Sequence, residues 1–344
     1  MPTKKPTMRE IARAVGTSAV TVSKAMAGKS GMSDRLRTKI LRKAKEMGYQ
    51  YPQSGRRILP EHMNIGILIP ERYFQTDSFY AEMYRRLIRK LSGQGHFGLL
   101  EILSAEDEQN LTLPNLLKGS VEGLILLGEP GKAYYRKIAL SGTPVVFLDF
   151  YDEQANADAV AGDNAYGSYR LTSHLIRRGH RKIGFVGNRL ATASIMDRYL
   201  GYYRAMLTQG LPIREDWTLP DRELAGDLVA PELPQEMPTA FVCNCDLTAR
   251  LLIDRLQKQG YRVPEDVSVT GFDDYPPGGE NEIGLSTFRI DTEGMIDLAI
   301  QKLLERCAGS DRPFGRMVVG GQPVYRESER ALDEPESRID RRNL

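Results

Sequence analysis

The side chains with the most reactive chemistry in this 344-residue sequence are three cysteines and four histidines. Cys243 and Cys245 are two residues apart in TAFVCNCD, so both would lie on one face of a strand. A structural zinc ion needs about four ligands, and no second Cys or His pair matches this one. We therefore expect buried thiols at a strand end, with no metal site and no disulfide framework.

No other arrangement of residues predicts catalysis. The segment GEPGKA (128–133) lacks the spacing and the final Ser or Thr of a phosphate-binding loop. G-x-S-x-G, H-E-x-x-H and a G-x-G-x-x-G that follows a strand are all missing. His174 and His180 lie on or beside a basic helix, HLIRRGHRK, with nothing that nominates them as catalytic. We expect a protein that is not an enzyme and that needs no cofactor.

The charged residues suggest a different chemistry, because they are distributed unevenly. Residues 1–62 contain 14 Lys or Arg and four acids, a net charge of +10, and the overall charge of +2 leaves −8 for residues 63–344. A basic segment joined to an acidic body is typical of a module that binds a polyanion. A solvated lysine-rich surface would show the same imbalance, so charge alone leaves both interpretations open.

Three short helices are predicted to position these basic residues. Their candidate N-caps are polar residues that can accept a hydrogen bond from the first turn. The N-caps and their helices are Thr7 with 8–15, Ser18 with 19–27 and Ser33 with 34–48. Gly16 ends the first helix where a positive φ is often required. Two short helices with a tight turn between them are typical of a helix-turn-helix, whose second helix enters the major groove of DNA.

From Asn64 onward the sequence alternates between predicted strands and helices. The strands are short apolar runs at 64–70, 97–103, 121–128, 143–150, 182–187, 239–244, 267–273 and 316–321. Helices with an apolar face are predicted at 78–93, 165–179, 198–209, 246–259 and 292–306. This alternation is typical of right-handed βαβ units in parallel sheets, and its length suits two α/β lobes rather than one.

The composition predicts a soluble globular protein, with 41% hydrophobic and 27% charged residues. No apolar run reaches the roughly 18 residues that a membrane span needs. The first residues, MPTKKPTMRE, are basic without an apolar stretch behind them, which argues against a secretory signal. Together with the cysteine usage, these features predict a cytoplasmic protein with no membrane partner.

Three blocks of the sequence resemble the LacI/GalR family of bacterial transcription regulators. They are REIARAVGTSAVTVSKAM (9–26), GDNAYGSYRLTSHLIRRGHRKIGFVG (162–187) and VPEDVSVTGFDD (263–274). The resemblance covers nearly the whole chain. It implies a three-helix helix-turn-helix DNA-binding domain followed by a two-lobed α/β domain like the periplasmic binding proteins, with parallel sheets flanked by helices. It also implies a homodimeric repressor that binds a pseudo-palindromic DNA operator and a small effector, with a carbohydrate as the expected class.

The element pattern and the resemblance together predict four parts. They are a DNA-binding head at 1–50, a hinge at 51–63, a two-lobed body at 64–333 and a disordered tail at 334–344. Within the body we expect an N-lobe of about 64–163 and 290–321, and a C-lobe of about 164–289 and 322–333. No leucine heptad follows residue 332, so we expect a dimer rather than a tetramer.

The resemblance also implies which residues of the head contact DNA. It places Ala19 and Val20 at the two positions that select the operator, where they can contact a thymine methyl but cannot form bidentate hydrogen bonds. Lys24 stands where the family has an arginine, which keeps the charge and loses the planar fork. The other expected contacts, mainly to phosphates, are Thr7, Thr17, Ser18, Thr21, Ser23 and Lys29.

The segment PQSGRRIL (52–59) resembles the family's hinge, with Pro52, Arg57 and Leu59 at matching positions. In the family this segment becomes helical on DNA and inserts its leucine into the minor groove, which implies that Arg57 contacts DNA and that Leu59 is the wedge. Arg56 replaces a small alanine and Pro60 follows the leucine directly. A merely extended linker is therefore the alternative.

For the body, the resemblance implies an effector site in the cleft between the lobes, where strand ends meet. Arg198 matches the family's ligand-binding arginine, Asp273 its cleft aspartate and Asp149 a strand end that often contacts the effector. Phe79 and Tyr80 are the expected aromatic contacts. The remaining expected contacts are Cys245, which replaces a common asparagine, Asp246, and Asp163, for which helix capping is an equal alternative.

The rival hypothesis is a cytoplasmic solute-binding protein or an enzyme of the same fold that has no operator specificity. A transport protein of this kind would need a signal peptide. Neither a solute-binding protein nor an enzyme has a use for a basic helix-turn-helix. The sequence therefore favours the regulator.

Overall fold

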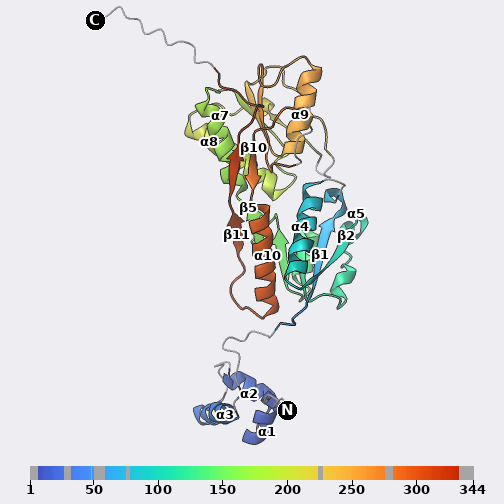
Figure 1. Ribbon diagram of the computed structural model, residues 1–344, viewed down its shortest axis with the longest axis vertical. Helices are drawn as coiled ribbons and strands as arrows, with labels where there is room; N and C mark the ends of the chain where they lie inside the picture. Colours follow the sequence, from blue (N-terminus) through green and yellow to red (C-terminus); the bar gives the residue numbers. More distant parts are fainter. Residues whose placement is uncertain are drawn as a thin grey trace, which may run out of the picture. The chain divides into compact units, whose positions relative to one another are not determined.

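The computed structural model describes residues 7–26, 32–47, 49, 59–74, 78–223, 228–275 and 282–332. The chain divides into two compact units, which are described separately. One consists mainly of Met1–Pro60 and the other mainly of Glu61–Leu304 and Pro313–Leu344 (Figure 1). Among the described residues, no helix is long and apolar enough to cross a bilayer.

The N-terminal unit contains three helices, α1 (Met8–Val15), α2 (Ala19–Met26) and α3 (Asp34–Glu46). Their facing sides form a small core of Ile11, Ala12, Val15, Val22, Ala25, Ile40 and Ala44. All seven side chains are aliphatic and small to medium in size, so the core is thin and the outer surface of each helix stays accessible. The predicted three-helix arrangement is confirmed.

The predicted ends of these helices are also present. Thr7 forms a capping box, in which its side chain accepts from the Glu10 amide while the Glu10 carboxylate accepts from the Thr7 amide. Ser18 and Ser33 accept hydrogen bonds from backbone amides three residues later, at 3.1 and 3.3 Å. Gly16 ends α1 with a φ of 76°, the left-handed conformation that favours glycine.

The larger unit begins with a six-stranded sheet in the order β11-β5-β4-β3-β1-β2, in which every pair is parallel. Its strands are β1 (Asn64–Pro70), β2 (Phe97–Leu103), β3 (Gly123–Leu127), β4 (Val145–Leu148), β5 (Asp158–Gly162) and β11 (Arg316–Val319). The helices that accompany it are α4 (Phe79–Gly93), α5 (Ala105–Gln109), α6 (Lys132–Ala139) and α10 (Thr292–Cys307). We call this part the N-lobe.

A second parallel sheet has the order β7-β6-β8-β9. Its strands are β6 (Ile183–Val186), β7 (Thr218–Leu219), β8 (Ala240–Cys243) and β9 (Ser268–Thr270). The helices α7 (Asn164–Arg177) and α8 (Ala193–Thr208) share one apolar core with it, and α9 (Asp246–Lys258) shares another. We call this part the C-lobe; a two-stranded antiparallel pair, β10 (Thr287–Ile290) and β12 (Gly321–Val324), completes the unit.

All eight predicted strands exist, and β1 and β2 have the predicted bounds. The strands β5, β7, β10 and β12 and the helices α5 and α6 were not predicted, because they are short or lack a long apolar run. Helix α8 starts at Ala193, five residues before its predicted start, since the Thr192 side chain caps it there. The predicted two-lobed α/β class is confirmed, whereas most of the hinge and the tail lie outside the described residues.

Helix α8 lies unusually close to α7 because of one glycine. A Cβ atom at Gly201 would overlap with the carbonyl oxygen of Ala165 in α7. Arg198 lies one turn before Gly201 on α8, and its Nε donates to Asn164 at the start of α7. The missing side chain at residue 201 therefore allows the contact that positions Arg198.

We predict that Gly201→Ala lowers the free energy of unfolding of the C-lobe by about 1–3 kcal/mol, because a methyl group forces α7 and α8 apart. Trp217, the single tryptophan, is buried in the C-lobe, so its fluorescence in a urea titration reports this transition. Gly93→Ala is the matched control, since no atom lies within 4 Å of a Cβ there. Equal midpoints for Gly201→Ala and the native chain would refute the close packing.

A buried carboxyl group ties the start of α9 to its surroundings. Asp246 is 2% exposed, accepts from the Thr287 hydroxyl at 2.6 Å and accepts from the Tyr275 amide at 2.8 Å. Burial raises the pKa of Asp246 from its ordinary value of 3.8 to about 8. The folded chain therefore holds this proton over a pH range in which the unfolded chain releases it.

Because the pKa of Asp246 is raised by folding, its stabilising contribution is complete below pH 3.8 and is lost as the pH rises towards 8. The free energy of unfolding should fall over this range by at most about 1.4 kcal/mol per pH unit for one group. Asp246→Asn removes the titration and should flatten this slope. Urea titrations followed by Trp217 fluorescence at several pH values measure this pH dependence of the free energy of unfolding. An unchanged slope in the variant would contradict the assignment of the titration to Asp246.

Candidate DNA-binding surface and ligand cavity

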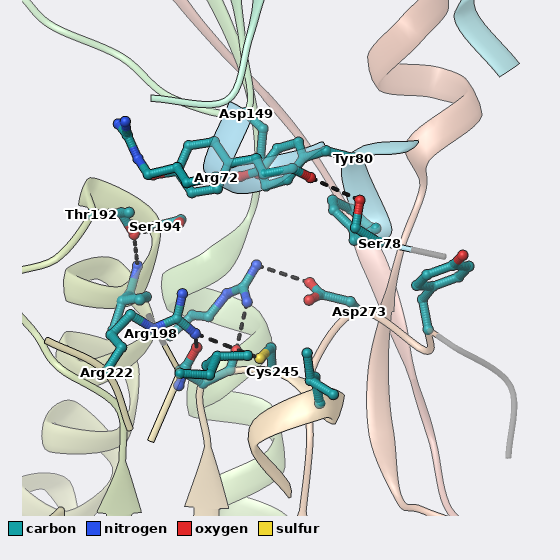
Figure 2. A pocket seen from close by; sticks show the side chains of 17 residues that line it. Arg72, Ser78, Tyr80, Asp149, Thr192, Ser194, Arg198, Arg222, Cys245 and Asp273 are labelled. Atoms are coloured by element: carbon teal, nitrogen blue, oxygen red, sulfur yellow. Dashed lines mark hydrogen bonds and ion pairs between the residues drawn. The ribbon is translucent and has the colours of Figure 1, made fainter. Parts of the chain in front are cut away.

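A cavity of about 270 Å³ lies between the N-lobe and the C-lobe, at the carboxyl ends of their parallel strands (Figure 2). Its lining comes from both lobes and combines aromatic, aliphatic, hydroxyl and charged side chains. The lining residues are Arg72, Tyr73, Ser78, Phe79, Tyr80, Asp149, Thr192, Ser194, Ile195, Arg198, Arg222, Leu228, Asn244, Cys245, Leu247, Asp273 and Tyr275.

Arg198 is a buried side chain of this cavity that is bonded to three other residues. It is 5% exposed and donates to Asn164 Oδ1 at 2.8 Å, to the Asn244 carbonyl at 2.5 Å and to Asp273 Oδ1 at 2.9 Å. Its guanidinium carbon lies 4.0 Å from the ring centre of Phe272. These partners come from α7 and from the segments after β8 and β9, so the arginine has a single orientation fixed by three parts of the C-lobe.

Asp149 faces the cavity from the N-lobe. Tyr80 donates its hydroxyl proton to Asp149 Oδ2 at 2.8 Å, whereas Oδ1 is buried and has no partner among the described residues. Burial raises the pKa of Asp149 and also raises the pKa of Asp273 to about 7, against the opposing effect of Arg198. The free oxygen of Asp149 is therefore available to accept a hydrogen bond from a ligand.

Both carboxylates stand on an unusual backbone. The φ angles are 71° at Asp149 and 102° at Asp273, in the left-handed region that residues other than glycine rarely adopt. Such strain persists where the surrounding structure enforces it, and it is concentrated at functional sites. Asp149 directly follows β4 and Asp273 lies three residues after β9, and both residues line the cavity at these strand ends.

Two further polar residues meet on the C-lobe side. Asp221 is fully buried and accepts from the side chains of Arg222, Asn244 and Thr248. Burial alone would raise the pKa of Asp221, but these donors, Arg222 first, hold it below its usual value. Arg222 is thus fixed by Asp221, and its Nη2 lies 3.9 Å from Cys245 Sγ. Burial raises the pKa of this thiol, so Cys245 remains a neutral group in the cavity.

Aromatic rings form the wall opposite these groups. Phe79 and Tyr80 start α4 and both line the cavity, as the sequence predicted. The ring centres of Tyr73 and Tyr80 are 5.0 Å apart, and those of Phe79 and Tyr275 are 6.3 Å apart. These rings are inclined to one another, and together with the planar polar groups they suit a ring-shaped ligand with hydroxyl groups.

Of the eight expected effector contacts, six line the cavity: Phe79, Tyr80, Asp149, Arg198, Cys245 and Asp273. The other two do not line it: the capping alternative is confirmed for Asp163, and the expected place in the cavity is wrong for Asp246. Asp163 caps α7 by accepting from the Tyr166 amide at 3.2 Å, and Asp246 is buried against Thr287. Both are absent from the lining because their carboxylates already serve backbone and hydroxyl donors.

The lining residues that were not predicted from the sequence are Arg72, Tyr73, Ser78, Thr192, Ser194, Ile195, Arg222, Leu228, Asn244, Leu247 and Tyr275. The charged pair Asp221–Arg222 directly after an apolar segment was the one signal that could have indicated Arg222. Cys243 packs in the apolar core beneath the cavity, as expected for a buried thiol. Within the described ranges, no group of three or more His, Cys, Asp or Glu could hold a metal ion.

On the N-terminal unit, α2 exposes the residues expected to contact DNA. Val20 is 66% exposed and Lys24 is also exposed, and both lie on the face of α2 that includes Thr21. The Thr21 hydroxyl lies 2.8 Å from that of Ser18, so these two residues help to form the cap.

The other expected contacts are less accessible or lie elsewhere. Ala19 is partly buried against the core and Ser23 is partly buried, whereas Thr7 is exposed at the start of α1. Lys29 and Arg57 lie outside the described residues. Leu59 is described and partly buried, but the segment before it is not, so its role as a wedge stays a prediction.

Comparison with known families gives two matches in the order that these units predict. Residues 7–52 match the model described as bacterial regulatory proteins, lacI family, and residues 172–329 match the periplasmic binding protein-like domain. The ribose operon repressor of Haemophilus influenzae is 28% identical over 330 residues, which are 94% of this chain and 98% of that protein.

Two solved structures have the same fold. The transcriptional regulator CelR in complex with cellobiose gives a TM-score of 0.66 at 23% identity, over 94% of this chain and 99% of that one. The lac repressor dimer bound to operator and the anti-inducer ONPF gives a TM-score of 0.62 at 19% identity, over 95% of this chain and 100% of that one. With a helix-turn-helix unit, a two-lobed ligand cavity and both family matches in place, the chain belongs to the LacI/GalR family of bacterial transcription regulators.

Proposed function

We propose that this regulator is a homodimeric repressor whose affinity for its operator is controlled by a carbohydrate bound in the cavity between the lobes. The main support for a carbohydrate ligand is Oδ1 of buried Asp149, which has no partner among the described residues. It lies in the same cavity as the fixed guanidinium of Arg198 and several aromatic rings. A sugar ring supplies hydroxyl donors for the carboxylate, hydroxyl acceptors for the arginine and an apolar face for the rings. The names of the ribose operon repressor and of the CelR–cellobiose complex support the same class.

The position of the cavity supports control by the ligand. Asp149 and Tyr80 belong to the N-lobe, whereas Arg198 and Asp273 belong to the C-lobe. A ligand bonded to both groups favours one arrangement of the lobes by its differential affinity for that arrangement. If effector binding weakens operator binding, the operator must weaken effector binding by the same factor.

A dimer follows from the proposed operator, because a pseudo-palindromic site presents two half-sites to two identical heads. The edge strand β2 supports it, since the large apolar side chains of Phe97, Leu99 and Ile102 are exposed there. An exposed apolar edge of this kind is typical of a surface that another chain covers.

The first prediction of this proposal concerns DNA. Selection from random duplex DNA with the full-length protein should enrich a two-fold symmetric site, and affinity for that site should fall steeply with salt as phosphate contacts release counterions. Lys24→Gln should reduce the slope of log affinity against log salt by about one per head, because one exposed lysine of α2 is lost. Lys118→Gln, an exposed lysine of the larger unit, is the control. A flat salt dependence or no enriched site would refute operator binding through this surface.

A second prediction concerns the response to sugar. Arg198→Lys keeps the charge but cannot bond Asn164, Asn244 and Asp273 together, so sugar affinity should fall roughly 10- to 100-fold, as for the loss of charged hydrogen bonds. Operator affinity without sugar should remain unchanged. Sugar-induced release from a labelled operator measures both, with Arg204→Lys on the exposed side of α8 as the control. Loss of sugar-free operator binding in Arg198→Lys would show that Arg198 does not act through the cavity.

A further inference from the structure

A second chamber of about 320 Å³ adjoins the cavity described above, which we now call the first chamber. Arg72, Tyr73, Thr192 and Arg222 line both chambers. The two spaces are therefore neighbours that share these four side chains.

The second chamber has walls that differ from those of the first. Its remaining lining consists of Glu108 in α5, the segment 129–132 that leads into α6, and Ala191 just before α8. Tyr73 is its single aromatic side chain among the described residues, whereas the first chamber has Phe79, Tyr80 and Tyr275 as well. The second chamber thus offers polar contacts to a ligand that the first chamber holds by its rings.

This second space is built by specific hydrogen bonds. Arg72 donates to Glu108 Oε2 at 2.6 Å and to the Glu129 carbonyl at 2.9 Å, and Glu108 Oε1 accepts from the Gly131 amide at 2.5 Å. The Glu129 carboxylate accepts from the Ala193 amide at 2.9 Å, at the start of α8 in the C-lobe. Both lobes therefore define the second chamber, as they do the first.

The charges around the two chambers indicate a neutral ligand. Each arginine has its own carboxylate partner: Arg72 with Glu108, Arg198 with Asp273 and Arg222 with Asp221. Glu129 occupies the N-terminus of α8, where a ligand anion would otherwise be favoured. At these arginines and at this helix N-terminus, an acidic ligand would have to displace one of these carboxylates, whereas hydroxyl groups can bond to the same side chains without doing so.

One charged side chain of the second chamber is left for the ligand. Lys132 is exposed and makes no hydrogen bond or ion pair within the described part of the chain. Its ammonium group is a strong donor to hydroxyl and ring oxygens. It lies at the start of α6, away from the shared boundary residues, so it can recognise a part of the ligand that the first chamber does not reach.

From these observations we infer that the effector is a neutral disaccharide, with one ring in the first chamber against the aromatic wall and the other in the second chamber within reach of Lys132. The two chambers have volumes of about 270 and 320 Å³, so each has space for a sugar ring. This inference rests on the carbohydrate effector proposed above and specifies its length and charge.

The test is isothermal titration of the full-length protein with cellobiose, maltose, lactose, melibiose, xylobiose and their constituent monosaccharides. At least one disaccharide should bind tenfold or more tightly than either of its units. Ala191→Phe, which fills the second chamber, should remove this advantage and leave monosaccharide binding unchanged. Lys132→Ala should weaken the disaccharide three- to tenfold, whereas Lys137→Ala, an exposed lysine of the same helix outside the lining, should not.

The possible failures are distinguishable. A monosaccharide that binds as tightly as every disaccharide containing it, with no effect of Ala191→Phe, would overturn the two-ring ligand and keep the sugar-controlled repressor. Tighter binding of gluconate or glucose 6-phosphate than of any disaccharide would overturn the neutral ligand. Operator binding without any response to the whole panel would overturn the carbohydrate effector and this inference with it. Urea titrations followed by Trp217 fluorescence confirm that each variant is folded.

Discussion

The burial of one guanidinium group governs the arrangement of the C-lobe around the ligand cavity. A charge removed from water is tolerated when it is paired and when its remaining donors are bonded, and Arg198 meets this condition through Asn164, Asn244 and Asp273. These partners belong to three different parts of the lobe, so their positions are linked. Gly201 completes the arrangement, because the absence of its side chain lets α8 approach α7 closely enough for the contact between Arg198 and Asn164.

On the N-lobe side of the cavity, in contrast to the fully bonded Arg198, the key charged group is only partly hydrogen-bonded. Asp149 is held in a left-handed conformation, and one of its oxygens has no partner among the residues that the structure describes, so it can accept from a ligand donor. The lobes are already joined elsewhere, since Arg316 stacks on Tyr151 and donates to Asp197 at 2.8 Å. A ligand therefore has to add only a modest differential free energy at Asp149 to favour one arrangement of the lobes over another.

The sequence was informative where structure is local and less so where it depends on distant partners. Strand β1 was predicted with its bounds because NIGILIP is a continuous apolar run, whereas β5 (DAVAG) is a strand because β4 and β11 flank it. Asp163, before α7, and Asp246, the first residue of α9, illustrate a limit of the resemblance: a carboxyl group at a helix start can bond to its own chain or to a ligand. The choice depends on where Tyr166 and Thr287 lie in the folded chain.

Two arginines that are ion-paired with carboxylates, Arg222 and Arg72, distinguish this cavity. Cys245 stands where the resemblance leads us to expect an asparagine, and a thiol is a much weaker hydrogen-bonding group than an amide. Arg222 lies beside that thiol and is held rigid by Asp221, so it can supply fixed planar donors in place of the missing amide. Arg222 and Arg72 both line the boundary of the two chambers, where the two rings of a disaccharide would be linked. Recognition at this boundary would depend on the linkage between the rings as well as on the rings themselves, and this gives a narrow cleft a means of separating isomeric disaccharides of the same composition.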